Sequence, residues 1–280
     1  MKRYQLGLYE KAVPADLDWD RRLEAAKLAG FDAMELSVDE TDERLARLDW
    51  SAAERRALHD KAREADLPFS SICLSAHRKY PLGSADPATE RRGLEIMQKA
   101  LELAVELSIP VIQLAGYDVY YETSTPETVA RFGDNLARAA EMAARFGVLL
   151  GFETMETPFM DTVGKAMAYV DAVNSPYLHV YPDIGNLTNA SLLYGEMVTD
   201  DLRRGAGHLI ATHIKETVPG KYREIPFGTG HVDFAAAIGT AWSLGVRRFV
   251  TELWYVGQPD WRKDIEFACR LARRHLDAQG

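Results

Sequence analysis

The sequence is poor in cysteine and in long hydrophobic runs, and these shortages exclude several classes of protein. Only Cys73 and Cys269 occur in 280 residues, too few for a disulfide framework or a cysteine-rich zinc site. Residues 1–14 contain no apolar core long enough for a signal peptide, and no later run approaches the length of a membrane span. We therefore expect a protein of the reducing cytoplasm with no membrane partner.

Positive charge is also in short supply. The chain has 33 Lys and Arg against 42 Asp and Glu, which gives a formal net charge of −9. Because contact with nucleic-acid phosphates normally needs a basic surface, this balance argues against a nucleic-acid partner. The 47% of hydrophobic and 27% of charged residues are typical of a globular protein with a large core.

Short apolar or β-rich runs alternate with segments of helical periodicity along the whole chain. Eight such runs occur, at residues 5–9, 31–38, 67–75, 111–116, 148–153, 178–183, 209–215 and 248–254. Strands that alternate with helices indicate a parallel sheet, and eight strand–helix units indicate a sheet closed into a barrel. No linker, low-complexity stretch or repeat divides the chain. The sequence therefore predicts one domain over residues 1–280, a single-domain (β/α)8 TIM barrel of the α/β class.

Several of the intervening helices carry start signals. Residues 51–54 (Ser-Ala-Ala-Glu) and 124–127 (Ser-Thr-Pro-Glu) have the spacing of capping boxes, and the second has a proline that a first helical turn tolerates. The Asp-Pro pair at residues 86–87 starts another helix in the same way. Cys269 falls in the apolar stripe of the last helix, so we interpret it as a core residue.

Each of the last four predicted strands brings an acidic or imidazole side chain to its carboxyl end: Glu153, Asp183, His213 and Glu252. Chemistry in barrels of this type takes place at that end of the strands. Any one of these residues alone could be a surface charge. Four together converge on one barrel mouth, where unpaired like charges repel and need a cation. Three carboxylates and one imidazole suit a divalent, fairly hard ion such as Mn²⁺, Mg²⁺ or Co²⁺.

The spacing of the other polar residues predicts which of them lie near the metal ligands and which do not. His208 should face away from the metal ligands, and His179 lies about 13 Å below the end of its strand. His77 follows the third strand on the same rim and is either a substrate contact or an ordinary loop histidine. Lys215 shares a strand face with the seventh-strand histidine, so it either meets a substrate anion or neutralises the carboxylates.

The loop at residues 221–230 combines cations, Arg223 among them, with glycines. Loops after the seventh and eighth strands of such barrels often bind phosphate. Glycines leave backbone N–H groups accessible, although two glycines also serve merely to shape a loop. We take Lys215 and Arg223 as candidate phosphate contacts, with Ser75 and His77 across the mouth.

Five segments resemble the L-ribulose-5-phosphate 3-epimerases, also called L-xylulose-5-phosphate 3-epimerases, within the xylose-isomerase-like barrels. They are LSVDETDERLARLDW (36–50), LSAHRKYPLGS (74–84), IQLAGYDVYYE (112–122), YPDIGNL (181–187) and PFGTGHVDF (226–234). The first three are long and specific to that group, whereas the last is shared by many barrels of the superfamily. The resemblance extends over nearly the whole chain.

This resemblance implies a role for each residue of the constellation. It implies that Glu153, Asp183, His213 and Glu252 hold the metal, in agreement with the strand-end argument, and that Glu153 and Glu252 exchange the proton. Related ketose 3-epimerases that act on free sugars have a histidine where this chain has Asn186, which we expect to contact substrate. The resemblance also implies a homodimer and a place in L-ascorbate catabolism. It leaves the choice among Mn²⁺, Mg²⁺, Co²⁺ and Zn²⁺ open.

Epimerisation at C3 of a ketose needs a proton to leave one face and return to the other through an enediolate. A chelated cation stabilises the developing charge, and two carboxylates act as base and acid. We therefore predict interconversion of L-xylulose 5-phosphate and L-ribulose 5-phosphate. A 3-epimerase of free ketoses and an aldose–ketose isomerase remain alternatives. A metal-dependent nuclease would need more histidine ligands and a basic groove, and a non-catalytic sugar-binding barrel would not need two proton-transfer carboxylates.

Overall fold

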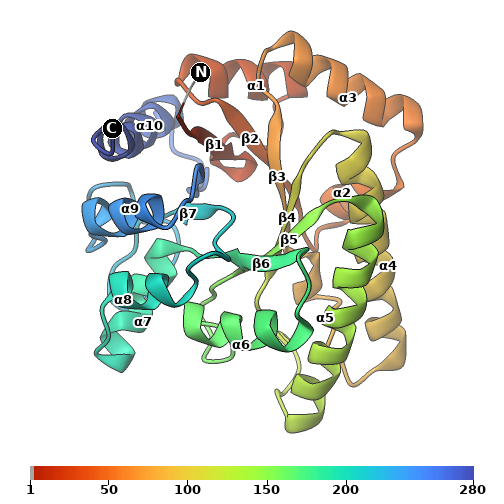
Figure 1. Cartoon of the computed structure of the whole chain (residues 1–280). Coiled ribbons are helices and arrows are strands. Elements are labelled where there is room, and N and C mark those ends of the chain that lie inside the picture. The colour runs from red at the N-terminus through yellow and green to blue at the C-terminus, as the bar shows by residue number, and fades with distance from the viewer. Residues whose placement is uncertain (1–2) are drawn as a thin grey trace.

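The computed structural model describes residues 3–280, in which eight parallel strands form a barrel surrounded by helices (Figure 1). The strands are β1 (Gln5–Tyr9), β2 (Ala33–Val38), β3 (Phe69–Leu74), β4 (Val111–Ala115), β5 (Leu149–Glu153), β6 (Leu178–Tyr181), β7 (Thr212–Ile214) and β8 (Arg248–Thr251). They pair in the order β6-β5-β4-β3-β2-β1-β8-β7. Isolated bridges between Val180 and Leu209 and between Asp183 and His213 connect the two outermost strands, so the barrel nearly closes. The predicted (β/α)8 TIM barrel is confirmed.

The helices lie outside the barrel and connect successive strands. They are α1 (Trp19–Leu28), α2 (Asp42–Leu45), α3 (Ala52–Glu64), α4 (Pro87–Glu106), α5 (Pro126–Phe146), α6 (Val163–Val173), α7 (Ile184–Tyr194), α8 (Val198–Arg204), α9 (Phe234–Ser243) and α10 (Trp261–Asp277), with 3-10 turns η1 (Glu10–Ala12), η2 (Ala46–Asp49) and η3 (Ser75–Arg78). Within residues 3–280, none of these helices is both long and apolar enough to cross a membrane.

Two of the predicted helix starts are found as expected, and one is shifted. Residues 51–54 form a capping box, and Asp86 caps α4. The box predicted at residues 124–127 instead uses Thr125 and Thr128, whose hydroxyls each accept the other residue's backbone N–H. The shift has a local cause, because the Ser124 hydroxyl donates to Asp118 Oδ2 at 2.7 Å and is therefore held outside the helix.

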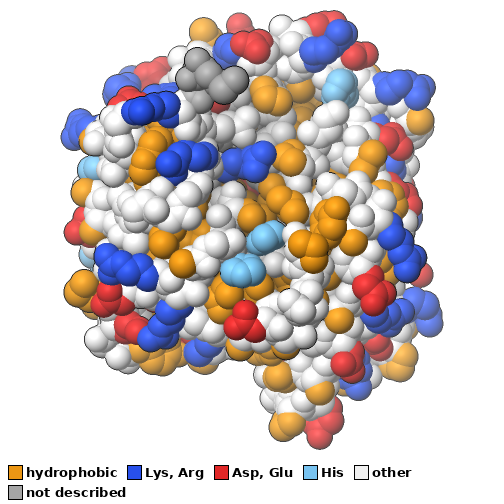
Figure 2. Space-filling view, viewed as in Figure 1, with side chains coloured by type: hydrophobic (Ala, Val, Ile, Leu, Met, Phe, Trp, Pro, Cys, Tyr) orange, Lys and Arg blue, Asp and Glu red, His pale blue; other side chains and the backbone are white. Residues whose placement is uncertain are grey.

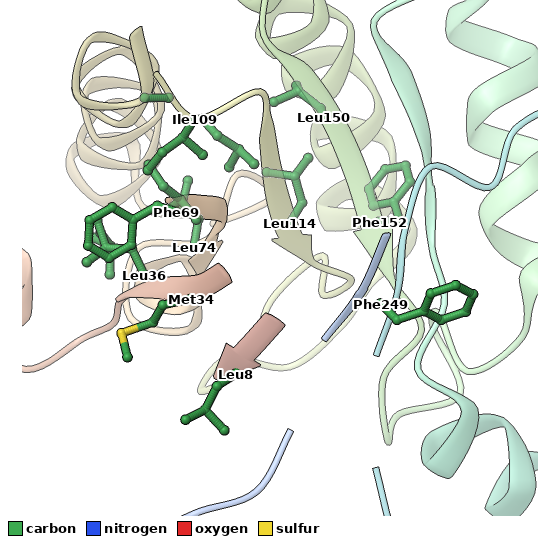
Figure 3. Close-up of a cluster of buried hydrophobic side chains, with 14 of the residues drawn as sticks. Leu8, Met34, Leu36, Phe69, Leu74, Ile109, Leu114, Leu150, Phe152 and Phe249 are labelled. Atoms are coloured by element: carbon green, nitrogen blue, oxygen red, sulfur yellow. The ribbon is translucent and has the colours of Figure 1, made fainter. Parts of the chain in front are cut away.

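Alternate strand residues build a large apolar core between the sheet and its helices. Leu8, Leu36, Leu114 and Phe152 are examples, and all four are buried (Figure 3). Because side chains alternate across a strand, the intervening residues point into the barrel. The outer layer thus fixes the strands, and the inner positions are left to form the site.

The barrel interior combines apolar side chains with buried polar ones. An inner apolar cluster includes Tyr9, Val111 and Val250. Glu35 on β2 and Gln113 on β4 are also completely buried. Bulky branched apolar residues normally dominate the interior of such barrels, so a carboxylate and an amide here require partners.

Two histidines lie away from the carboxylates, near the start of their strands. Figure 2 shows histidine side chains side by side near the middle of the face that Figure 1 presents, among hydrophobic side chains. The rings of His179 and His208 lie close together, with centroids 5.7 Å apart. His179 Nε2 lies 3.0 Å from the Pro176 carbonyl oxygen. Neither histidine belongs to the cluster of strand-end residues, as their spacing predicts.

Candidate metal centre and active site

The barrel brings the four strand-end residues together. Glu153 is the last residue of β5, His213 lies in β7, Asp183 directly precedes α7, and Glu252 follows β8. Each offers one ligand atom, and these atoms all lie within 4.8 Å of one another. All four side chains are buried. The cluster could therefore hold one metal ion.

His213 presents its Nδ1 atom to the three carboxylates. This nitrogen lies 3.1 Å from Glu153 Oε1, 3.2 Å from Glu252 Oε2 and 3.8 Å from Asp183 Oδ2. The two carboxylates of β5 and β8 thus approach the same ring nitrogen from different strands. A cation among these atoms would be surrounded by one nitrogen and three oxygen ligands.

Asp183 has two tasks, because it also caps α7. Its Oδ1 accepts the Asn186 backbone N–H at 2.8 Å, and its own N–H donates to Thr154 Oγ1 at 3.0 Å. A carboxylate that caps a helix in this way is held in one orientation. The cap leaves the second oxygen, Oδ2, directed to the cluster, where it lies near His213 and Lys215.

Lys215 supplies positive charge next to the carboxylates. Its Nζ lies 2.8 Å from Asp183 Oδ2 and 3.4 Å from Glu252 Oε2. Burial acts against the charge of this ammonium, but Asp183, Glu252 and Glu153 outweigh it and raise the pKa of Lys215. The sequence left two roles open for Lys215, and this geometry supports neutralisation of the carboxylates.

The pKa values of Asp183 and Glu252 are shifted in opposite directions. Burial raises the pKa of Asp183 against the opposing effect of Lys215, and the neighbouring Glu252 and Glu153 add to the increase. Burial also acts against the charge of Glu252, but Lys215 and His213 outweigh it and hold the pKa of Glu252 well below its usual range. Packing three carboxylates this closely is costly, and a bound cation would relieve the repulsion.

The lone pairs of the cluster fit a metal ion. Apart from ion pairs with Lys215 and His213, Asp183 Oδ2 and Glu252 Oε2 are buried without a hydrogen-bond donor among residues 3–280. Buried polar atoms without partners are rare unless a ligand completes them. Three carboxylate oxygens and one imidazole are also donors that Mn²⁺, Mg²⁺, Co²⁺ and Zn²⁺ accept.

Residues inside the barrel hold two members of the cluster. His213 Nε2 lies 2.8 Å from Glu35 Oε1, and the Gln113 side-chain amide donates to Glu153 Oε2. Sequence reasoning missed both residues. The available signal was a charged residue in the middle of the predicted strand at 31–38, which two-residue alternation points into the barrel.

A second charged group lies on the rim, beyond β4 and β5. Arg223 Nη2 lies 2.6 Å from Glu156 Oε1, and the Tyr117 hydroxyl donates to the other oxygen of Glu156. Burial acts against the charge of Glu156, but Arg223 and the Tyr117 hydroxyl outweigh it and lower its pKa. The Arg78 guanidinium lies over the rings of Tyr117 and Tyr120 at 5.9 and 5.5 Å. Sequence reasoning found Arg223 but missed its partner, since loops give no periodicity from which to place Glu156.

The remaining candidate substrate residues lie around the mouth in different environments. Ser75 begins η3, and its hydroxyl is buried without a partner among the described residues. Asn186 donates from Nδ2 to the Thr154 carbonyl at 2.7 Å, while its Oδ1 is likewise unpartnered. His77 is buried, with Nε2 3.1 Å from the Gly93 carbonyl oxygen of α4. Its ring is thus in contact with the outer helical layer.

The loop after β7 is organised by a buried carboxylate. Glu216 accepts backbone N–H groups from Thr217 at 3.1 Å, Gly228 at 3.0 Å and Val232 at 3.3 Å. Gly230 packs so tightly here that an added Cβ would lie 2.1 Å from the Thr217 carbonyl oxygen. The amide of Gly228 is therefore used to fold the loop, and it is not available to a phosphate in this conformation.

Comparison with known proteins agrees with the barrel fold. The family model described as xylose isomerase-like TIM barrel matches residues 23–271. L-ribulose-5-phosphate 3-epimerase UlaE of Shigella flexneri is 44% identical over 280 residues, which cover 100% of this chain and 97% of the relative. The protein of the same name from Escherichia coli O139:H28 is 47% identical over 254 residues, covering 90% of this chain and 88% of the relative.

A solved structure shows the same fold at low sequence identity. D-psicose 3-epimerase from Clostridium cellulolyticum H10, in complex with D-tagatose, matches with a TM-score of 0.81 at 15% identity, over 97% of this chain and 99% of that one. The enzyme class expected from the sequence, an isomerase, is confirmed by the curated relatives. The chain belongs to the L-ribulose-5-phosphate 3-epimerase family within the xylose isomerase-like TIM barrels.

Proposed function

We propose that the protein is a metal-dependent 3-epimerase that interconverts L-xylulose 5-phosphate and L-ribulose 5-phosphate. The observation that carries this proposal is the convergence of Glu153 and Glu252, from β5 and β8, on one buried cluster with Asp183 and His213. The names of the curated relatives supply the substrate class. L-ascorbate catabolism is the corresponding metabolic setting.

Glu153 and Glu252 would carry the proton between the two faces of the sugar. Each carboxylate has one oxygen near His213 Nδ1, and the two belong to separate strands. One would remove the C3 proton and the other would return a proton to the opposite face, with the roles exchanged in the reverse reaction. When bound, a divalent ion would stabilise the negative charge of the enediolate as a Lewis acid. Gln113 would hold Glu153 in position through its amide.

Unpartnered polar atoms at the mouth support a substrate rich in hydroxyl groups. Ser75 Oγ and Asn186 Oδ1 are buried without hydrogen-bond partners among residues 3–280. A ketose could donate to either atom, because hydroxyl groups both donate and accept. We propose both residues as substrate contacts. His77 would act indirectly, by fixing η3, whose first residue is Ser75.

The phosphate contact is proposed for the rim and not for the metal cluster. Lys215 is already paired with two carboxylates of the cluster, so it would stabilise the metal ligands. Among residues 3–280, Glu156 is the one acidic partner of Arg223, whose side chain is about a third exposed, so Arg223 remains the candidate for a phosphate contact.

Proton exchange with heavy water tests the reaction. The protein, loaded in turn with Mn²⁺, Mg²⁺, Co²⁺ or Zn²⁺, is incubated with L-xylulose 5-phosphate in deuterium oxide. Formation of L-ribulose 5-phosphate with deuterium at C3 is expected. Deuterium at C1 or C2 would instead indicate an aldose–ketose isomerase. Equal rates with unphosphorylated L-xylulose would identify a 3-epimerase of free ketoses. Absence of exchange with every metal would refute an epimerase.

We also propose a homodimer that uses the end of α7 and the start of α8. Leu192, Leu193 and Met197 are more than half exposed there, at 59%, 66% and 62%. Clustered apolar side chains on a surface are typical of protein interfaces. Sedimentation should give twice the chain mass, and Leu193→Glu should give monomers. A monomeric wild-type protein would refute this proposal.

A further inference from the structure

Glu35 is a carboxylate in the barrel interior that takes no part in the proton transfer proposed above. It lies in the middle of β2, its side chain is completely buried, and no lysine or arginine among residues 3–280 forms an ion pair with it. Burying a carboxylate is costly unless hydrogen bonds satisfy its oxygens. The partners of Glu35 therefore indicate why the chain retains it.

Three groups around Glu35 satisfy both of its oxygens. The Ser71 hydroxyl donates to Oε2 at 2.6 Å, and the Tyr181 hydroxyl donates to the same oxygen at 3.0 Å. His213 Nε2 lies 2.8 Å from the other oxygen, Oε1. Two hydroxyl groups already donate to Oε2, so the arrangement uses Glu35 as an acceptor, and the hydrogen of this last contact belongs to His213 Nε2.

Tyr181 also restrains the ring of His213 through an edge-on contact. Tyr181 meets the His213 ring edge-on, with centroids 4.8 Å apart and an interplanar angle of 66°. Tyr181 has room because Gly151 faces it from β5, where an added Cβ would lie 3.0 Å from the Tyr181 Cβ. The same tyrosine thus restrains the ring and donates to the carboxylate that accepts from the ring.

We propose that Glu35 is the positioning residue of the metal centre: it fixes His213 with Nε2 protonated and Nδ1 free to bind the metal. This inference rests on the proposed metal site. With one hydrogen held on Nε2, Nδ1 is the ring nitrogen that a metal ion would take, and it already faces Glu153 and Glu252, 3.1 and 3.2 Å away. A carboxylate that accepts the second N–H of a metal-bound histidine orients the ring and increases its basicity.

Metal affinity of the purified protein is the first test. Dissociation constants for Mn²⁺ and Zn²⁺ are measured by competition with a chelator. Loss of such a partner typically weakens metal affinity by about 10- to 100-fold. We expect losses in this range for Glu35→Gln and Glu35→Ala, with the larger loss for alanine because glutamine keeps an acceptor oxygen. Ser71→Ala should give a smaller loss, since Tyr181 still donates to Glu35.

A matched control separates positioning from general destabilisation. Asp201 on α8 is a similarly buried carboxylate, which accepts the backbone N–H groups of Val163 and Gly164 at 2.7 and 3.0 Å. Asp201→Asn removes a buried carboxylate in the outer helical layer. The metal affinity of this variant should equal that of the wild type. Equal weakening in Asp201→Asn and Glu35→Gln would overturn the proposal.

Two further measurements report on the ring itself. In Zn²⁺-loaded protein labelled with 15N-histidine, His213 should show a protonated Nε2 and a metal-bound Nδ1, and binding through Nε2 would overturn the proposal. Because the proposal has Glu35 act only through His213, excess metal should restore most of the kcat of Glu35→Gln. A low kcat that excess metal does not restore would contradict positioning.

The outcomes also separate this proposal from the proposed function. If the wild type binds none of the four metals, the metal site itself is wrong, and this inference fails with it. If the wild type binds metal and Glu35→Gln binds it equally well, only the role of Glu35 is wrong. Should the Glu35 variants fail to fold, Ser71→Ala and Tyr181→Phe test the same contact without changing the charge, and wild-type affinity in both would overturn the proposal.

Discussion

Replacing Lys215 with methionine should damage the carboxylate cluster and not a phosphate contact. Methionine keeps an unbranched side chain but removes the ammonium that lies 2.8 Å from Asp183 Oδ2 and 3.4 Å from Glu252 Oε2. Removing one partner of a buried ion pair typically costs about 3–5 kcal/mol, because the remaining charge is left uncompensated. With about 2.1 cal/mol/K of unfolding entropy per residue, a loss of 1 kcal/mol lowers the melting temperature of a chain of this size by about 1.7 °C, so the metal-free variant should melt roughly 5–9 °C lower.

Metal should reduce this difference. An ion at about a thousand times its dissociation constant stabilises the folded protein by about 4 kcal/mol. In Lys215→Met the ion would also replace the missing positive charge, so the melting temperatures of variant and wild type should converge when metal is added. Calorimetry with and without Mn²⁺ measures this effect. Equal melting temperatures of the two metal-free proteins would show that the ion pair contributes nothing to stability.

Kinetics on two substrates complete the test of Lys215. Its loss should lower kcat/KM for L-xylulose 5-phosphate and for L-xylulose by similar factors, since the metal ligands serve both sugars. Arg223→Met should instead mainly affect the phosphorylated sugar, by roughly 10- to 100-fold for a lost charge-assisted contact. A loss in Lys215→Met that is confined to the phosphorylated sugar would identify Lys215 as the phosphate anchor and refute this reasoning.

Three further predictions concern the proton carriers, a buried histidine and a crowded glycine. Glu153→Gln and Glu252→Gln should each abolish epimerisation while circular dichroism stays native, and wild-type turnover at saturating metal in either variant would remove its role. Burial lowers the pKa of His77 from the ordinary histidine value of 6.5 to about 4. The unfolded chain therefore binds more protons between these values, and stability should fall by up to about 3 kcal/mol as the pH drops from 6.5 to 4. Denaturant titrations should show that His77→Gln loses less free energy of unfolding than the wild type as the pH drops from 6.5 to 4. The same pH dependence in both proteins would contradict this assignment. Gly230→Ala should lower the melting temperature because its Cβ would meet a carbonyl oxygen at 2.1 Å, whereas Gly133→Ala, where the nearest atom is 3.9 Å away, should be tolerated; equal effects would refute the clash.

The strands could be predicted closely where the apolar run and the hydrogen-bonded ladder coincide. β1 has its predicted bounds, residues 5–9. The seventh strand was predicted at residues 209–215 but pairs with β8 only at Thr212–Ile214. Its apolar pattern continues through residues that make only an isolated bridge to β6. Hydrophobic alternation predicts which face of a strand is buried, but it does not predict how many residues form backbone hydrogen bonds to the neighbouring strand.

Some residues of the candidate site could likewise be predicted from the sequence, and others could not. The four strand-end residues could be predicted because chain topology alone brings strand ends to one rim. Glu35 and Glu156 could not, since their partners are distant in sequence: Glu35 meets His213 across 178 residues, and Glu156 meets Arg223 across 67. Such contacts depend on which residues face each other across the barrel or the rim. Local pattern contains no record of that arrangement.

The contact between Glu35 and His213 makes the two half-barrels unequal. All four strand-end residues of the cluster lie in or after β5 to β8, whereas Glu35 and Ser71 lie in β2 and β3. A fragment that contains only the second half would carry all four residues of the proposed metal centre but no acceptor for His213 Nε2. Under the proposed positioning role, the first half contributes to the chemistry through Glu35, and a functional recombination of half-barrels from different relatives should need this acceptor to match its histidine.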